Sequence, residues 1–273
     1  MFDSGVGGLT VLRALRAVSP AEDFIYLGDT ARLPYGTKSA ASVVRYSLQC
    51  ADALIQRGVR LLVVACNTAS ASALDALRRQ HPDTPVIGVI EPGAKAAVAV
   101  SAAQHIAVIA TEGTIAGGAY ETAIHRLSPS ARVTSLACSL FVSMAEEGWT
   151  EGAIVESVAR HYLEPIFPAG DMPDTLVLGC THFPALAPAI RAVLPSHVII
   201  VDSAASTAAA VLQELGGAPG AGRESVARGE AGADVVSGTV RWLATDSAAR
   251  FARVGSAFLG ETLRAESVEI IDL

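Results

Sequence analysis

Short apolar runs alternate with longer segments of helical period along most of the chain. The runs have the length of strands, and the segments between them are rich in alanine, with Pro or Gly at most of the joints. Strand and helix signals that alternate in this way are typical of βαβ units and a parallel sheet. The pattern therefore predicts an α/β fold.

The predicted elements cover most of the sequence. The expected strands are Phe24–Leu27, Leu61–Ala65, Val86–Ile90, Ile106–Ala110, Val133–Leu136, Leu176–Leu178 and Val198–Val201. The expected helices are Leu9–Val18, Ser39–Gln56, Ser70–Gln80, Glu91–Ser101, Ile115–Leu127, Glu151–Ile166, Ala185–Leu194 and Ser203–Leu215. A loop is predicted over Gly216–Gly238, followed by a strand (Val240–Leu243), a helix (Ser247–Phe258) and a strand (Val268–Asp272).

Polar residues at the predicted strand ends recur at a nearly constant spacing. Four pairs of strand ends are separated by 108 to 114 positions, namely Asp3 and Thr111, Asp29 and Cys138, Cys66 and Cys180, and Glu91 and Asp202. This regularity predicts a pseudo-twofold internal duplication into two similar α/β domains with mostly parallel sheets. We expect residues 1–92 plus 205–273 to form the first domain, which the C-terminal elements complete, and residues 93–204 to form the second. Open α/β sheets bind ligands at the carboxyl ends of their strands, so the active site is expected at the domain interface.

Composition and charge narrow the class of protein. Hydrophobic residues make up 51% of the chain and charged residues 17%, which argues against disorder. The net charge of −7 and the lack of a basic cluster argue against a nucleic-acid partner. No signal peptide or membrane span is expected, because the most apolar stretch, residues 96–110, is short and interrupted by polar residues. The protein is therefore expected to be cytoplasmic and without a membrane partner.

Two of the four cysteines stand at equivalent strand ends. Cys66 follows an apolar strand and precedes Asn67 and Thr68, which are good N-cap residues, so its thiol is expected near a helix N-terminus that lowers its pKa. Cys180 repeats the arrangement before Thr181 and His182. The alternative is that both are small buried core residues. Their equivalent placement in a duplicated fold favours a functional role.

Two thiols on facing domains suit the racemisation of an amino acid. One base removes the α-proton from one face of Cα, and an acid on the other face returns a proton. A thiol with an ordinary pKa of about 8.5 can take either part near neutral pH. We therefore expect Cys66 and Cys180 to be a pair of acid/base groups.

Other sulfur or cofactor chemistry fits the sequence less well. Pyridoxal chemistry needs a Schiff-base lysine, and the only lysines, Lys38 and Lys95, are not at predicted strand ends. The spacing of Cys66, Cys180 and His182 is not that of a zinc site. The sequence contains no Cys-x-x-Cys pair, which argues against a disulfide framework and against thiol redox activity. We expect no cofactor and no metal.

Several further motifs suit a small charged ligand. The segment Asp3–Gly8 opens a helix and offers backbone N–H groups and the Ser4 hydroxyl as an anion cradle, although a simple tight turn is the alternative. Asp3 could assist Cys66 or bind an ammonium group. Pro34-Tyr35-Gly36 is predicted to be a turn that presents backbone N–H groups. Thr111 and Thr114 could contact this ligand or only cap a helix. Glu146 could lie near the ligand or only at a solvated helix end.

The motifs around the two cysteines resemble those of bacterial glutamate racemases, in the aspartate/glutamate racemase superfamily. The likeness rests on Cys66-Asn67-Thr68-Ala69-Ser70-Ala71 and Gly179-Cys180-Thr181-His182-Phe183-Pro184, and extends to Phe2–Leu9, Gly28–Gly36 and Val201-Asp202-Ser203. The resemblance implies cofactor-independent interconversion of L- and D-glutamate, supplying D-glutamate for peptidoglycan and cell-wall biosynthesis. It also implies two domains with the site between them, often assembled as a homodimer.

The same resemblance implies roles for individual residues. Cys66 and Cys180 would be the two acid/base thiols, supported by Asp3 and His182. The substrate would be held by Asp3, Ser4, Pro34, Tyr35, Gly36, Asn67, Thr68, Thr111, Thr114, Glu146, Thr181 and His182. The chain departs from the family pattern in having almost no residues before Phe2-Asp3, so we expect that either the start is truncated or the first strand is lost.

Two rival functions remain open on the sequence. An aspartate or hydantoin racemase of the same superfamily would share the cysteine pair, although Thr181–Pro184 and Pro34–Gly36 favour glutamate. A non-catalytic protein that binds a cellular partner, such as gyrase, is the alternative from another class.

Overall fold

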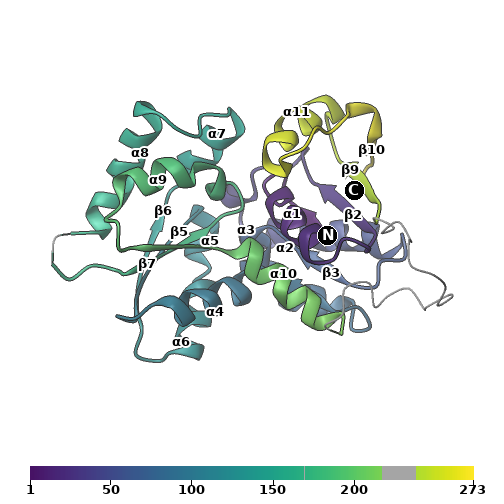
Figure 1. The fold of residues 1–273 in the computed structure, drawn as a ribbon. Coiled ribbons are helices and arrows are strands. Elements are labelled where there is room, and N and C mark those ends of the chain that lie inside the picture. Colours follow the sequence, from purple (N-terminus) through teal and green to yellow (C-terminus); the bar gives the residue numbers. More distant parts are fainter. Residues whose placement is uncertain (169, 217–237) are drawn as a thin grey trace, which may run out of the picture.

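The computed structural model describes residues 1–168, 170–216 and 238–273, which form two sheets covered by helices on both faces (Figure 1). The first sheet has the strand order β10-β9-β2-β1-β3-β4 and the second has the order β6-β5-β7-β8. Every strand pairing described is parallel. The predicted α/β class with two parallel sheets is confirmed. The loop predicted over Gly216–Gly238 lies outside the described residues except at its two ends.

The boundaries of most elements agree with the predicted ones within a few residues. The strands are β1 (Phe2–Asp3), β2 (Phe24–Gly28), β3 (Leu62–Val64), β4 (Val86–Gly88), β5 (His105–Ala110), β6 (Arg132–Ala137), β7 (Thr175–Gly179), β8 (Ile199–Asp202), β9 (Val240–Ala244) and β10 (Val268–Ile270). The α-helices are α1 (Leu9–Val18), α2 (Ala40–Ile55), α3 (Asn67–Gln80), α4 (Ile90–Val100), α5 (Glu112–Ala116), α6 (Ala119–Leu127), α7 (Leu140–Glu146), α8 (Ala153–Leu163), α9 (Ala187–Val193), α10 (Ser203–Glu214) and α11 (Ala248–Leu259). Short 3-10 helices are η1 (Tyr35–Thr37), η2 (Glu164–Ile166), η3 (Phe183–Leu186) and η4 (Ala265–Ser267).

The two sheets share a common strand order. The first sheet contains the run β2-β1-β3-β4, and the second sheet has the order β6-β5-β7-β8. In both, the strand that comes second in the chain lies at one end, followed by the first, third and fourth. This correspondence supports the predicted internal duplication. The C-terminal strands extend the first sheet, where Phe24 of β2 pairs with Val240 of β9 and Trp242 of β9 pairs with Val268 of β10. Both chain termini consequently lie in the same half of the molecule (Figure 1).

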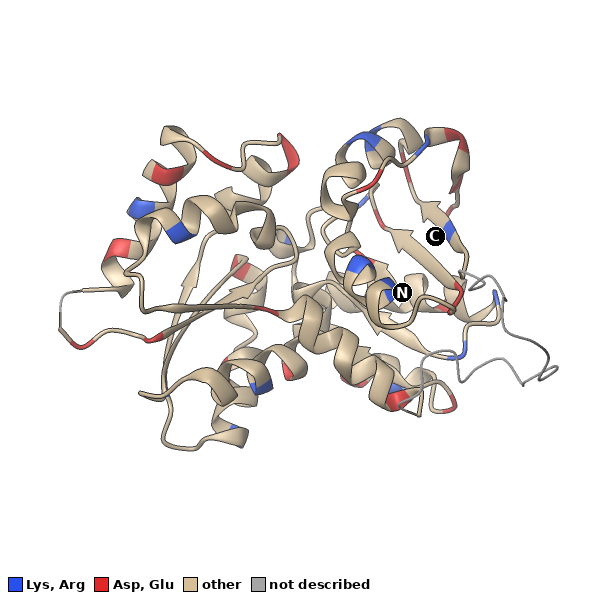
Figure 2. Ribbon diagram, viewed as in Figure 1, with Lys and Arg blue, Asp and Glu red and all other residues tan. Residues whose placement is uncertain are grey.

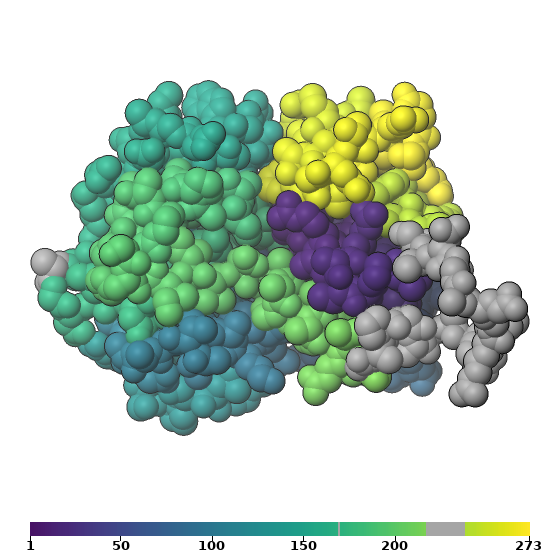
Figure 3. All heavy atoms as spheres, in the orientation of Figure 1, coloured from purple at the N-terminus to yellow at the C-terminus, as the bar shows by residue number. Residues whose placement is uncertain are grey.

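The chain crosses between the sheets twice. It leaves the first sheet through α4 and returns through α10. These two helices pack against each other, and α10 also packs against α1. Figure 3 shows the result as two halves that meet along a seam, with the middle of the chain on one side and its two ends on the other. We propose that the domain boundaries lie at the crossings, at 92–93 and 204–205.

The strand β5 of the second sheet is buried on both faces because helices cover both. In β5, Ile106 and Val108 pack in a cluster with Ile124 of α6, whereas Ala107 and Ile109 belong to a different cluster on the other face. Strands buried on two faces need apolar residues at every position, which is why this strand has no polar alternation.

Positively and negatively charged residues are interspersed over the outer helices and loops in the view of Figure 2. Every helix in the described ranges falls short of the length and apolarity that a bilayer crossing requires.

Three elements differ from the prediction. The helix expected over Ile115–Leu127 is divided into α5 and α6, and Gly118 between them has a φ of +59° in the left-handed region. The seven-residue α7 was missed because it is too short to show a helical period. The first strand is not lost but reduced to Phe2 and Asp3, which pair with β2 on one side while Phe2 pairs with β3 on the other.

Gly28 provides a stability test of the close packing at the end of β2. A Cβ on Gly28 would lie 2.5 Å from the carbonyl oxygen of Gly5 and 2.8 Å from the ring of Phe251. We expect Gly28→Ala to lower the free energy of unfolding by about 1–3 kcal/mol, measured by urea denaturation. Gly117→Ala is the control, because a Cβ there meets its nearest neighbour at 3.5 Å. Equal unfolding midpoints for wild type and Gly28→Ala would contradict the steric argument.

Candidate active site

Cys66 lies at the seam between the sheets, immediately before α3. It is itself the N-cap of α3, and its Sγ accepts a hydrogen bond from the backbone N–H of Ala69 at 3.5 Å. The thiol also lies 3.7 Å from Oγ of Ser4. The sequence placed the cap at Asn67 or Thr68, but β3 ends at Val64 and the helix begins at Asn67, so the cap falls on the cysteine.

The surroundings of Cys66 shift its pKa upward. The side chain is only 5% exposed, and burial together with the charge of Asp3 raises the pKa of the Cys66 thiol to about 12. The N–H of Ala69 and the hydroxyl of Ser4 oppose this shift but do not reverse it. The expectation that the helix N-terminus lowers this pKa is therefore wrong in its net direction, because desolvation of the thiolate outweighs the helix. At neutral pH Cys66 is a thiol in this closed site.

Cys180 lies at the corresponding end of β7 and has a different environment. Its Sγ is 3.8 Å from Nδ1 of His182. Nε2 of His182 is 3.2 Å from Glu146, whose second carboxylate oxygen accepts a hydrogen bond from Arg250 at 2.9 Å. Glu146 is only 11% exposed, so it is not the solvated helix end that was the structural alternative. Polar contacts through His182 and Glu146 therefore connect Sγ of Cys180 with Arg250, which lies in the half that contains the first sheet.

His182 is held in its protonated form by these neighbours. Burial lowers its pKa, but the hydrogen bonds to Cys180 and Glu146 and the charges of Cys180 and Asp3 outweigh burial and raise the pKa to about 10. The ring of Phe258 packs edge-on against the imidazole at 5.1 Å. An imidazolium next to Cys180 stabilises negative charge on that sulfur.

Two buried polar atoms at the site lack a hydrogen-bond partner among the described residues. One is Oδ1 of Asp3, whose other oxygen accepts from the N–H of Gly5 at 3.0 Å. The other is Nδ2 of Asn67, whose Oδ1 accepts from the hydroxyl of Tyr120 at 2.8 Å. Buried polar groups are nearly always paired, so an unpaired acceptor and an unpaired donor in one region indicate a polar ligand. Burial raises the pKa of Asp3, against the lowering effects of His182 and of backbone N–H groups.

Three threonine hydroxyls connect the two halves. Oγ1 of Thr68 lies 2.9 Å from that of Thr111 and 3.0 Å from that of Thr114, and the latter two are 3.0 Å apart. Thr111 precedes α5 but makes no side-chain cap, so its hydroxyl serves this triangle. The hydroxyls are buried and form a polar part of the seam.

Glycines allow the two halves to approach closely at the site. A Cβ on Gly7 would come within 2.6 Å of Nδ1 of His182, and one on Gly36 would lie 2.8 Å from Oγ1 of Thr111. Thr181 is buried here, also against Gly7. The charge of Cys180 contributes to the raised pKa of Cys66, so the two sulfurs are near enough for their charges to interact.

Most residues expected at the site meet there, with one change of role. Tyr35 is fully buried, and its hydroxyl bonds to Asp29 and Cys50, away from the thiols. Tyr35 can therefore reach a ligand only through its backbone, as Pro34 and Gly36 beside it can. The sequence analysis missed Tyr120 and Arg250, which hold Asn67 and Glu146. Both are ordinary helix residues far from their partners in the chain, so no sequence signal marked them.

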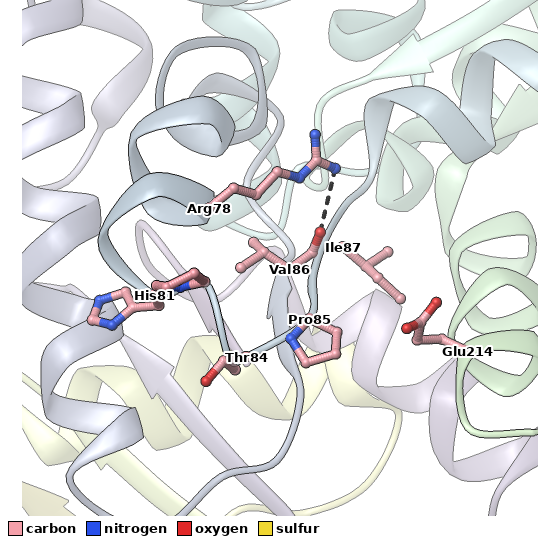
Figure 4. A pocket seen from close by; sticks show the side chains of 8 residues that line it. Arg78, His81, Thr84, Pro85, Val86, Ile87 and Glu214 are labelled. Atoms are coloured by element: carbon pink, nitrogen blue, oxygen red, sulfur yellow. Dashed lines mark hydrogen bonds between the residues drawn. The ribbon is translucent and has the colours of Figure 1, made fainter.

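Other cavities lie apart from the thiols. One of about 290 Å³ is formed where α3, β4 and α10 meet, and Arg78 beside it donates a hydrogen bond to the carbonyl of Val86 at 3.3 Å (Figure 4). None of the residues that line it belongs to the expected site. Within residues 1–168, 170–216 and 238–273, no three His, Cys, Asp or Glu side chains are grouped so that they could hold a metal ion.

Comparisons with known proteins agree on one family. The sequence model of the Asp/Glu/Hydantoin racemase family matches residues 9–211. A glutamate racemase of Geobacter metallireducens is 49% identical over 96% of this chain and 93% of its own length, and one of Koribacter versatilis is 46% identical over 100% and 96%. The crystal structure of glutamate racemase from Francisella tularensis, in complex with D-glutamate, superposes with a TM-score of 0.87 at 35% identity, covering 99% of this chain and 95% of that one.

The contact between Glu146 and His182 can be tested by titration. We expect Glu146→Gln to lower the pKa of His182 from about 10, because the carboxylate stabilises the imidazolium, as read from imidazole NMR shifts against pH. Glu147→Gln, at an exposed neighbour, should leave it unchanged. The folded-state pKa lies above the ordinary value of about 6.5, so protonated His182 stabilises the fold below pH 6.5, and this contribution is lost as the pH rises through 10. An unshifted pKa in Glu146→Gln would remove Glu146 from this role.

Proposed function

The chain belongs to the Asp/Glu/Hydantoin racemase family, and from this premise we propose that it interconverts L-glutamate and D-glutamate with Cys66 and Cys180 as its two acid/base groups. The observation that carries the proposal is the pair of buried thiols, one at a strand end of each sheet, on either side of the seam between them. The activity is that of an isomerase that works with thiols alone. Its product, D-glutamate, would serve peptidoglycan synthesis in the cytoplasm.

The reaction transfers one proton in each of two steps. A thiolate on one side of the substrate removes the proton from Cα, so that a C–H bond breaks and an S–H bond forms. The thiol on the other side then gives its proton to Cα from the opposite face, so that its S–H bond breaks and a new C–H bond forms. After one turnover the protonation states of the two sulfurs are exchanged, which prepares the site for the other enantiomer.

The two sulfurs have different electrostatic surroundings. Cys66 is the thiol of the resting site, because burial and the charge of Asp3 raise its pKa to about 12. The imidazolium of His182, 3.8 Å from Sγ of Cys180, stabilises negative charge on the other sulfur. We infer that Cys66 rests as a thiol, whereas Cys180 faces a positively charged neighbour.

The unpaired polar groups suit the charges of an amino acid. Oδ1 of Asp3 is an acceptor for the substrate ammonium group, and Nδ2 of Asn67 is a donor for a carboxylate oxygen. Negative charge grows on the α-carboxylate when the α-proton leaves, so a donor fixed there by Tyr120 stabilises the transition state more than the ground state. The hydroxyls of Ser4, Thr68, Thr111, Thr114 and Thr181 are the further hydrogen-bonding groups of the site.

Glutamate is the proposed substrate within the family. The relatives of 46% to 49% identity are glutamate racemases, and the similar structure from Francisella tularensis holds D-glutamate. Aspartate, shorter by one methylene, is the alternative that an assay must distinguish.

The roles of the thiols are tested by removing each one. We expect Cys66→Ala and Cys180→Ala each to lower kcat for racemisation at least about 100-fold, because each variant lacks the acid or the base on one face. The measurement is formation of the opposite enantiomer from each glutamate enantiomer, followed by circular dichroism together with solvent deuterium at Cα, in a chelator and without pyridoxal phosphate. Cys138→Ala, at a buried cysteine with no place in the site, is the matched control.

Different outcomes of this assay separate the parts of the proposal. Near wild-type racemisation by either alanine variant would exclude the two-thiol mechanism. Exchange into aspartate instead of glutamate would change the substrate, and exchange into neither would leave the protein without this activity.

Alkylation rates test whether the different electrostatic surroundings make the two sulfurs differ in reactivity. The two side chains are similarly buried, at 5% and 7% exposure, so a difference in rate reflects charge more than access. We expect iodoacetamide at pH 7.5 to modify Cys180 before Cys66, and His182→Asn to slow the reaction at Cys180, as followed by peptide mass spectrometry. Faster modification of Cys66 would contradict the inference that His182 makes Cys180 the more reactive sulfur.

A further inference from the structure

A cavity of about 450 Å³ lies next to the proposed site, on the seam between the two halves. Its lining includes Thr37 and Lys38 of the first half and Glu112 and Gly113 of the second. It also includes Thr68, whose hydroxyl belongs to the threonine triangle of the site. We call it the outer cavity. Because both thiols are at least nine-tenths buried, a substrate reaches them only when the seam opens, and the outer cavity is the hollow next to that opening.

The outer cavity carries one charge from each half. Lys38, which follows η1, and Glu112, the first residue of α5, are both exposed. Neither side chain has an ion-pair partner in the part of the chain that the structure describes, although both line the same hollow. A cation on one wall and an anion on the other match a ligand that carries both charges.

We propose that the outer cavity binds the amino-acid zwitterion before it enters the site, with Lys38 contacting a carboxylate and Glu112 contacting the ammonium group. The inference rests on the proposed racemase function. Lys38 is one of only two lysines in a chain whose net charge of −7 repels an anionic amino acid. The ammonium group of Lys38 gives a substrate carboxylate one attractive contact at this hollow, which raises the rate of productive encounter.

The partition between the outer cavity and the site consists mainly of backbone. A Cβ on Gly113 would lie 3.1 Å from the carbonyl oxygen of Gly36 and 3.2 Å from Cγ2 of Thr68. The halves therefore meet here without large side chains between them, and the hydroxyl contacts of Thr68 with Thr111 and Thr114 join them at this point. A bound zwitterion lies beside the contact that must open.

The test compares Lys38→Gln and Glu112→Gln with wild type in steady-state racemisation. We expect each variant to lower kcat/KM about 3- to 10-fold for both enantiomers at low ionic strength, with kcat unchanged, and 0.5 M salt to diminish the effect. Lys95→Gln, at the only other lysine, and Glu164→Gln, at an exposed glutamate of the second half, are controls that change the net charge equally. Both should keep the wild-type kcat/KM.

Glu112→Gln distinguishes a zwitterion site from steering by net charge. Removing a negative charge would raise kcat/KM for an anionic substrate if only the net charge mattered, whereas loss of the ammonium contact lowers it. An increased or unchanged kcat/KM in Glu112→Gln, or an unchanged one in Lys38→Gln, would overturn the inference while racemisation by wild type stands. A wild-type protein that does not racemise glutamate would overturn both proposals.

Discussion

The exclusion of water from the seam between the two sheets is the constraint on which the chemistry of this molecule depends. Cys66, Asp3 and His182 are all buried there, and desolvation is the largest influence on the pKa of each. At Cys66 the neighbouring dipoles are too weak to offset it, so the thiol stays protonated. At His182 the contacts with Cys180 and Glu146 do offset it, so the imidazole is charged. The same burial thus produces opposite results at two places, according to the partners that each group finds.

The two thiols are equivalent in the fold but not in their surroundings. The common strand order of the sheets brings a cysteine to the end of a central strand in each half. The residues that support them come from elsewhere, with Ser4 and Asp3 beside Cys66, and His182, Glu146 and Arg250 beside Cys180. Arg250 belongs to α11, so the C-terminal return of the chain to the first half reaches the sulfur of the second half. An internal duplication can therefore supply a symmetric pair of groups while other contacts make their electrostatic surroundings unequal.

The sequence predicted the parts of this arrangement that depend on local patterns. Continuous apolar runs identified nearly all strands, and the recurring polar strand ends identified Cys66 and Cys180 as a pair. It did not predict features that depend on desolvation or on distant contacts. The direction of the pKa shift at Cys66, the burial of Glu146 and the turning of the Tyr35 hydroxyl toward Asp29 all follow from packing between segments far apart in the chain. A two-residue strand and a seven-residue helix were beyond what periodicity can detect.

The unequal surroundings of the two sulfurs do not favour one product, for a thermodynamic reason. Two enantiomers have equal free energy in an achiral solvent, so the ratio of kcat/KM for the two directions must equal one, whatever the protein contributes. The surroundings of Cys66 and Cys180 can therefore change kcat/KM only by the same factor in both directions, although each direction can divide it differently between kcat and KM. Any group that acts before the chemistry, as Lys38 and Glu112 do in the outer cavity, must likewise affect both directions equally. Asymmetry in the site is thus compatible with racemisation, provided that proton transfer through the protein returns the two sulfurs to a single resting state or that both states remain accessible.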